Sequence, residues 1–191
     1  MSKNLLELPS DLPVPEDDGA AAHLANAAVP DVALPSTAGG AVVLRELPGR
    51  TVVYAFPRIG VPGEATLDDN WEAIPGARGC TPQSCAFRDH HAELLSAGAD
   101  IFGLSTQDTA FQREAVDRLH LPFALLSDDR LELARALDLP SFLAGSRTRV
   151  RLLKRFTLVL RDGVIEHVFY PVFPPNTHAD AVLDWLKSNP V

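Results

Sequence analysis

The two cysteines of this chain, Cys80 and Cys85, lie in one short segment with the sequence GCTPQSC. A cysteine thiolate is a strong nucleophile, and it can be oxidised to a sulfenic acid or to a disulfide. Two cysteines are too few for a disulfide framework, and they could bind zinc only if histidines completed the site. We therefore expect a redox-active or catalytic pair, with a pair of small buried side chains as the alternative.

The position of Cys80 favours a reactive thiolate. It follows a loop rich in glycine and proline, and the residues after it predict a helix that ends near Gly98. At the start of a helix, free N–H groups and the positive end of the dipole stabilise an anion. Arg78 and Arg88 are close in sequence and add positive charge. We therefore expect Cys80 to be the attacking cysteine.

Cys85 follows Cys80 by a spacing of the form C-x-x-x-x-C. On an intact helix this spacing separates the Cα atoms by roughly 8–9 Å, whereas a disulfide needs about 7 Å or less. Either the two cysteines never bond, or the first turns of the helix unwind when they do. A thioredoxin-like dithiol reductase is a rival interpretation, but its usual spacing is C-x-x-C.

The elements around the cysteines predict a layered α/β domain. Strands alternate with helices after the cysteine segment, which is typical of parallel strand pairs, and the turn Asp162-Gly163 predicts a hairpin. The predicted strands are 32–34, 42–44, 51–56, 101–104, 123–126, 156–160 and 164–169, and the predicted helices after the cysteine helix are 109–119, 130–137 and 179–187.

Two segments lie outside this regular pattern. Residues 1–27 are rich in proline and acidic residues, so we expect an N-terminal extension that packs loosely or is partly mobile, followed by one domain over 28–191. Residues 57–79 form a long irregular stretch between the central strand and Cys80. Loops of this length are uncommon in compact domains and are usually functional.

The composition limits the partners and the compartment. The net charge is −8 and the pI is about 5.1, which argues against nucleic acid or an anionic membrane as the main partner. No stretch is apolar enough to span a bilayer, and the first residues lack the apolar core of a signal peptide. We therefore expect a cytoplasmic protein.

The cysteine segment resembles the active site of a known family. Residues 79–89, with the sequence GCTPQSCAFRD, are similar to the motif G-C-T-x-x-x-C-x-F-R-D of the peroxiredoxin Q group, also called the bacterioferritin comigratory protein group. The segments 165–169 and 182–187 are similar to the end of the same proteins. The resemblance covers the chain from about Val29 onward.

This resemblance implies a thioredoxin-like fold, with a mixed central sheet flanked by helices, and thiol-dependent reduction of hydroperoxides without a cofactor or metal. It implies that Cys80 is the peroxidatic cysteine and Cys85 the resolving cysteine, which form an intramolecular disulfide. Arg155, in the context R-x-T, would hold the thiolate and polarise the peroxide, since a guanidinium keeps its charge. Pro57, Gly79 and Thr81 would belong to the substrate pocket.

The resemblance also implies a thioredoxin-like protein as the reductant. We expect a monomer, with a dimer as the alternative. A peroxide-sensing redox switch that uses the same cysteines is an alternative function, and a disulfide reductase is another. Catalytic turnover separates the first two, because a sensor is oxidised once whereas an enzyme cycles.

The sequence departs from the family pattern before Cys80. The motif P-x-x-x-T-x-x-C places a threonine three residues before the cysteine, where this chain has Ala77, and about twenty residues separate Pro57 from Cys80. Thr66 is the only serine or threonine between them. One candidate to replace the missing hydroxyl is that of Thr66; the alternative, which we favour, is that backbone N–H groups of Gly79 and Cys80 together with Arg155 suffice. We still expect the loop as a whole to matter, so that deleting residues 61–75 sharply lowers peroxide reactivity while the domain folds.

Several other polar groups have simpler explanations. We interpret His90 and His91 as surface or capping residues, and the acidic pairs 68–69 and 128–129 as caps and solvated side chains. The basic cluster between Arg147 and Arg155 is interpreted as a solvated loop, with docking of an acidic reductant as the alternative.

Overall fold

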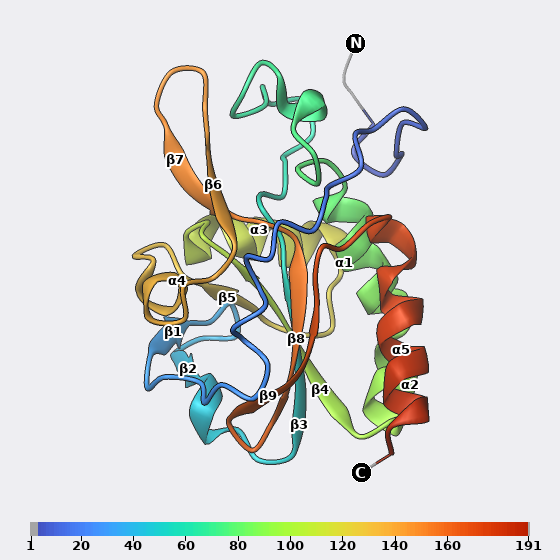
Figure 1. Cartoon of the computed structure of the whole chain (residues 1–191). Coiled ribbons are helices and arrows are strands. Elements are labelled where there is room, and N and C mark those ends of the chain that lie inside the picture. Colours follow the sequence, from blue (N-terminus) through green and yellow to red (C-terminus); the bar gives the residue numbers. More distant parts are fainter. Residues whose placement is uncertain (1–3, 191) are drawn as a thin grey trace.

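The computed structural model describes residues 4–190, and its centre is a five-stranded sheet with the order β5-β4-β3-β8-β9 (Figure 1). Strands β3, β4 and β5 are parallel, whereas β8 is antiparallel to β3 and β9 is antiparallel to β8. The sheet is therefore mixed, as predicted. The strands span Arg50–Ala55 (β3), Ala99–Ser105 (β4), Leu125–Ser127 (β5), Phe156–Arg161 (β8) and Val164–Phe169 (β9).

Each face of the sheet is buried under a different set of elements. Side chains of β3 alternate between the faces, with Val52 and Tyr54 in one hydrophobic cluster and Val53 and Ala55 in the other. The first cluster includes residues of α1 (Cys80–Asp89), α2 (His91–Ser96), α3 (Thr109–Leu119) and α5 (His178–Ser188). The second includes residues of α4 (Glu132–Ala136), of the hairpin β1 (Ala33–Pro35) and β2 (Ala41–Val43), and of the 3-10 helix Leu44–Glu46 next to it.

Most predicted elements are present, but the helix after Cys80 differs. It was expected to run without a break to Gly98, whereas the structure divides it into α1 and α2 at His90. The His90 backbone leaves the helical conformation with ψ of 8°, and its ring contacts Glu93 Oε2 at 2.5 Å and Asp180 Oδ1 at 3.0 Å. The break lets α2 lie against β4 while α1 packs on α5.

A further hairpin, formed by β6 (Ser141–Ala144) and β7 (Val150–Leu153), was not predicted. Arg147 and Arg149 lie in the exposed turn of this hairpin, as expected for a solvated loop, whereas Arg151 belongs to β7 and Arg155 is buried. The hairpin is stabilised by the loop before Cys80, because Trp71 and Leu152 belong to one small hydrophobic cluster. This contact joins segments far apart in sequence, so no local pattern indicates it.

The N-terminal extension packs more closely than expected. Leu24 is fully buried in the core, His23 Nε2 lies 2.8 Å from Leu137 O, and Asn26 N–H donates to Ile165 O at 2.9 Å. The predicted boundary between residues 27 and 28 stays a prediction. No helix within residues 4–190 is long and apolar enough to cross a membrane.

Candidate active site

Cys80 is the first residue of α1 and is 3% exposed. The chain reaches it through Gly79, whose φ of 105° lies in the left-handed region that favours glycine. A Cβ at Gly79 would also come within 2.4 Å of Pro175 Cγ, so a larger residue does not fit. Gly79 therefore fixes the direction in which the chain enters the helix and the place of the sulfur.

The start of α1 has unpaired N–H donors. The first bond into the helix runs from Gln83 N–H to Gly79 O at 3.0 Å, and Pro82 has no N–H. The N–H groups of Gly79, Cys80 and Thr81 have no acceptor among residues 4–190. Such groups favour an anion beside the helix start, either a thiolate or a developing oxyanion.

Arg155, directly before β8, contacts the sulfur. Its Nη2 donates to Cys80 Sγ at 3.2 Å and to three carbonyl oxygens of residues 76–78 at 3.1–3.4 Å, while Nη1 donates to Gln83 Oε1. The side chain is 3% exposed, and no ion pair among residues 4–190 involves it. A buried cation favours a nearby negative charge, so this contact suits a sulfur that reacts as a thiolate.

Ala77 occupies the position of the family threonine, and its side chain is fully buried. Its carbonyl oxygen lies 3.6 Å from Cys80 Sγ, within reach of the thiol proton. Thr66 does not supply the missing hydroxyl to the sulfur, because its Oγ1 donates to Asp68 O at 2.8 Å. The groups next to the sulfur are thus the Arg155 guanidinium and the Ala77 carbonyl, and replacement of the hydroxyl by backbone N–H groups stays a prediction.

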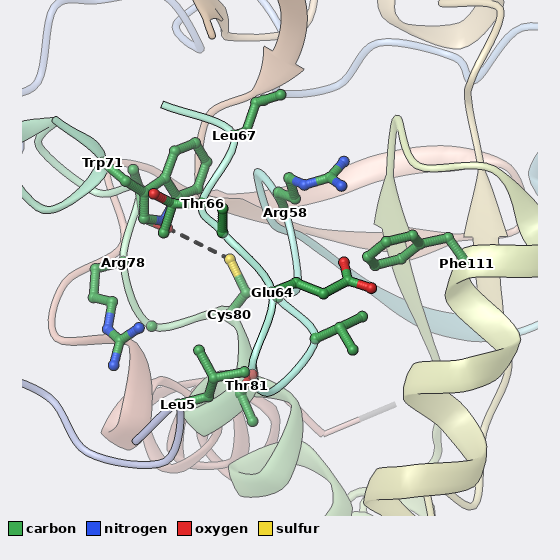
Figure 2. A pocket seen from close by; sticks show the side chains of 15 residues that line it. Leu5, Arg58, Glu64, Thr66, Leu67, Trp71, Arg78, Cys80, Thr81 and Phe111 are labelled. Carbon is green, nitrogen blue, oxygen red and sulfur yellow. Dashed lines mark hydrogen bonds between the residues drawn. The ribbon is translucent and has the colours of Figure 1, made fainter. Parts of the chain in front are cut away.

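A cavity of about 60 Å³ opens beside Cys80 (Figure 2). Gly79 and Thr81 line it, whereas Pro57 is buried and is not among the residues that line it. Arg155 is also absent from the lining, so its position favours a role on the sulfur, and its role toward the peroxide stays a prediction. The remaining lining residues come from four segments of the chain: Leu5, Arg58, Gly60, Val61, Glu64, Ala65, Thr66, Leu67, Trp71, Ala77, Arg78 and Phe111.

Arg58, which was not predicted, lines this cavity together with Arg78. Its Cζ lies 4.7 Å from the centroid of the Phe111 ring, a cation–π contact. Burial lowers the pKa of the Arg58 guanidinium below its ordinary value. The signal was available, since Arg58 directly follows Pro57, but only the fold shows that it faces the same cavity as Cys80.

Cys85 lies on α1 in a different environment. It is half-buried, packs against the hydrophobic cluster beneath the helix and does not line the cavity. Burial raises the pKa of the Cys85 thiol, which therefore stays protonated near neutral pH. Both cysteines are free and both lie within the intact helix α1, so a bond between them requires the helix to unwind.

Aromatic side chains of the core pack against α1. Tyr54 and Phe87 stack with their ring centroids 4.3 Å apart, and Tyr54 OH donates to Ser84 Oγ at 3.1 Å. The His178 ring meets Phe87 edge-on and lies 2.8 Å from Thr157 Oγ1 through Nε2. Burial, and to a smaller extent the Arg155 charge, lowers the pKa of His178 to about 3.

The other polar groups have structural roles. Asp128 accepts hydrogen bonds from Leu133 and Ala134 N–H at the start of α4, and Asp68 accepts one from Gly145 N–H at 2.9 Å. Asp128 thus pairs free N–H groups at the start of α4, whereas Asp68 bonds to the turn of the β6–β7 hairpin. Within residues 4–190 no three His, Cys, Asp or Glu side chains form a group suited to a metal ion.

The fold and the site together define a thioredoxin-like α/β protein with a cysteine-based redox centre. Residues 24–183 match the Redoxin family. Peroxiredoxin Q of Gentiana triflora, a chloroplastic protein, is 31% identical over 97% of this chain and 79% of its own length. Peroxiredoxin Q of Xanthomonas campestris has a similar solved structure, with a TM-score of 0.65, 26% identity and coverage of 94% of this chain and 97% of that chain.

The chain belongs to the Redoxin family and, within it, to the peroxiredoxin Q group. This membership confirms the family and the thioredoxin-like fold predicted from the cysteine segment. Peroxiredoxin Q proteins of two rice subspecies are 33% identical over 84% of this chain, which spans 65% of their length.

Proposed function

We propose that this chain is a thiol-dependent peroxidase that reduces hydrogen peroxide and organic hydroperoxides. The observation that carries the proposal is the contact of 3.2 Å between Arg155 Nη2 and Cys80 Sγ, beside a cavity lined by residues 79–81, whose backbone N–H groups have no acceptor among residues 4–190. This combination stabilises both the attacking thiolate and the departing oxygen. The family membership supports the same reaction.

In the first step, the Cys80 thiolate attacks the terminal oxygen of the peroxide. A sulfur–oxygen bond forms, the oxygen–oxygen bond breaks, and the released alkoxide or hydroxide takes up a proton and leaves as alcohol or water. Cys80 becomes a sulfenic acid. The free N–H groups of Cys80 and Thr81, with Arg58 across the cavity, stabilise the charge that develops on the leaving oxygen.

In the second step, Cys85 resolves the sulfenic acid. Its sulfur bonds to the Cys80 sulfur, and the sulfenic oxygen leaves as water after taking up the proton of the Cys85 thiol. The start of α1 must unwind first, which separates Cys80 from Arg155 and from the cavity. A thioredoxin-like dithiol then supplies two electrons and two protons, and the helix forms again.

The partners and the compartment follow from the same chemistry. We propose a thioredoxin-like protein as the reductant, a cytoplasmic location for a chain with two free cysteines, and action as a monomer.

Three proteins test this proposal: the wild type, Cys80→Ser and Cys85→Ser, each with hydrogen peroxide and a thioredoxin system. We expect the wild type to turn over many times and Cys80→Ser to consume no peroxide. Cys85→Ser should consume one equivalent and accumulate sulfenic acid, then sulfinic acid with excess peroxide. Normal turnover by Cys80→Ser would refute the assignment, and a wild type that reacts once without cycling would favour the redox-switch alternative.

A further inference from the structure

Residues 4–8 lie against the loop that precedes Cys80. Arg78 Nη2 donates to Asn4 O at 2.6 Å and to Glu7 O at 3.2 Å. Leu8 approaches Gly79 so closely that a Cβ there would lie 3.0 Å from Leu8 Cδ2. These contacts hold residues 4–8, which we call the N-terminal strap, at the rim of the active-site cavity.

Leu5 is the strap residue that lines this cavity, together with Cys80 and Thr81 (Figure 2). Its two terminal carbons approach Gly60, since a Cβ at Gly60 would lie 3.5 Å from each of them. The next residue, Leu6, is 61% exposed. The two neighbouring leucines of the strap therefore have different surroundings: Leu5 lines the cavity, whereas Leu6 is exposed to solvent.

The space beside Cys80 limits the size of a peroxide. A cavity of about 60 Å³ holds a few water-sized molecules, which suits hydrogen peroxide or a small alkyl hydroperoxide. A cumyl group, with a phenyl ring and two methyl groups, is larger than this space, so it must pack against the side chains that line the cavity, Leu5 among them. Trp71 packs in the small hydrophobic cluster of the loop and Phe111 belongs to α3, whereas Leu5 belongs to the N-terminal strap, so shortening Leu5 enlarges the cavity without altering the loop or α3.

We propose that Leu5 is a specificity-determining residue that limits the reaction to hydrogen peroxide and small alkyl hydroperoxides and disfavours bulky aryl hydroperoxides. This inference rests on the proposed peroxidase function and names its substrate class. Leu5 does not touch the reacting atoms in the mechanism, so shortening it enlarges the cavity without removing a catalytic group.

The test compares kcat/KM for hydrogen peroxide and for cumene hydroperoxide in the wild type, Leu5→Ala, Leu5→Met and Leu6→Ala. We expect Leu5→Ala to raise the ratio of cumene hydroperoxide to hydrogen peroxide activity by about tenfold, the discrimination that small changes in an apolar pocket produce. Leu5→Met keeps the volume of the side chain and should keep the wild-type ratio. Leu6→Ala shortens a leucine that is exposed to solvent, and it should also keep the wild-type ratio.

The outcomes separate the two proposals. An active wild type whose ratio does not change, or falls, in Leu5→Ala would overturn the role of Leu5 and leave the peroxidase function standing. If the ratio of cumene hydroperoxide to hydrogen peroxide activity rose equally in Leu6→Ala, the role of Leu5 would also be overturned, because the effect would then not come from the cavity wall. A wild type without activity toward either peroxide would refute the peroxidase function, and this inference with it.

Discussion

Acidification is expected to destabilise the folded protein through one buried histidine. His178 begins α5 and is almost fully buried between Phe87 and Phe169, close to Arg155. Burial, and secondarily the Arg155 charge, lowers its pKa from 6.5 to about 3. The unfolded chain therefore binds a proton near pH 6.5 that the folded protein does not bind until near pH 3, so stability falls as the pH decreases through this window.

The magnitude follows from the two pKa values. At about pH 5 the unfolded histidine is almost fully protonated and the folded one is neutral, which costs about 2 kcal/mol relative to about pH 7.5. His90 acts in the opposite direction, because its bond to Glu93 raises its pKa and its protonation stabilises the fold. The wild-type pH dependence therefore contains both effects, and only a variant isolates His178.

Urea unfolding of the reduced protein, followed by the fluorescence of Trp71 and Trp185, provides the assay. The free energy of unfolding is measured at both pH values for the wild type, His178→Gln and His90→Gln. We expect the loss on acidification to be smaller by about 2 kcal/mol in His178→Gln than in the wild type. In His90→Gln, the loss should be larger than in the wild type. Equal losses in the wild type and His178→Gln would refute the argument from burial.

Three further experiments address the reactive segment. Arg155→Lys keeps a charge but loses the planar fork that binds Cys80 Sγ and the carbonyl groups of residues 76–78, so stopped-flow measurement should show the peroxide rate falling at least about tenfold, or 1.4 kcal/mol. Hydrogen exchange over residues 79–90 should be faster after oxidation to the disulfide, because α1 must unwind, and equal protection in both redox states would exclude the switch. Thr66→Val should leave the peroxide rate unchanged, since its hydroxyl binds Asp68 O, and a large decrease would show that this hydroxyl takes part in the reaction.

Local sequence patterns were sufficient to predict most of the fold. Helix α3 has the predicted bounds of 109–119, and the β8–β9 hairpin turns at Asp162 and Gly163 as expected. These elements depend on interactions between residues that are near in sequence: apolar periodicity, caps and turn residues. The β6–β7 hairpin was missed because its partner is Trp71 in a distant loop, and the break at His90 involves Asp180 of α5.

The sequence by itself determined the reactive groups of the site. The spacing of Cys80 and Cys85, the glycine before them and the helix pattern after them indicated a redox pair at a helix start, and the motif identified the family. These features are local, because the dipole, the free N–H groups and the incompatibility of an intact helix with a disulfide all belong to one segment.

Only the tertiary structure decided what surrounds the sulfur. Arg155 reaches Cys80 from a strand start 75 residues away, while Leu5 and Arg58 approach the same cavity from two other segments. It also separated residues that the motif had grouped together, since Thr81 lines the cavity whereas Pro57 does not. Which side chains meet depends on how the sheet, the loop and the N-terminal strap pack, and packing between distant segments leaves no periodic signal in the sequence.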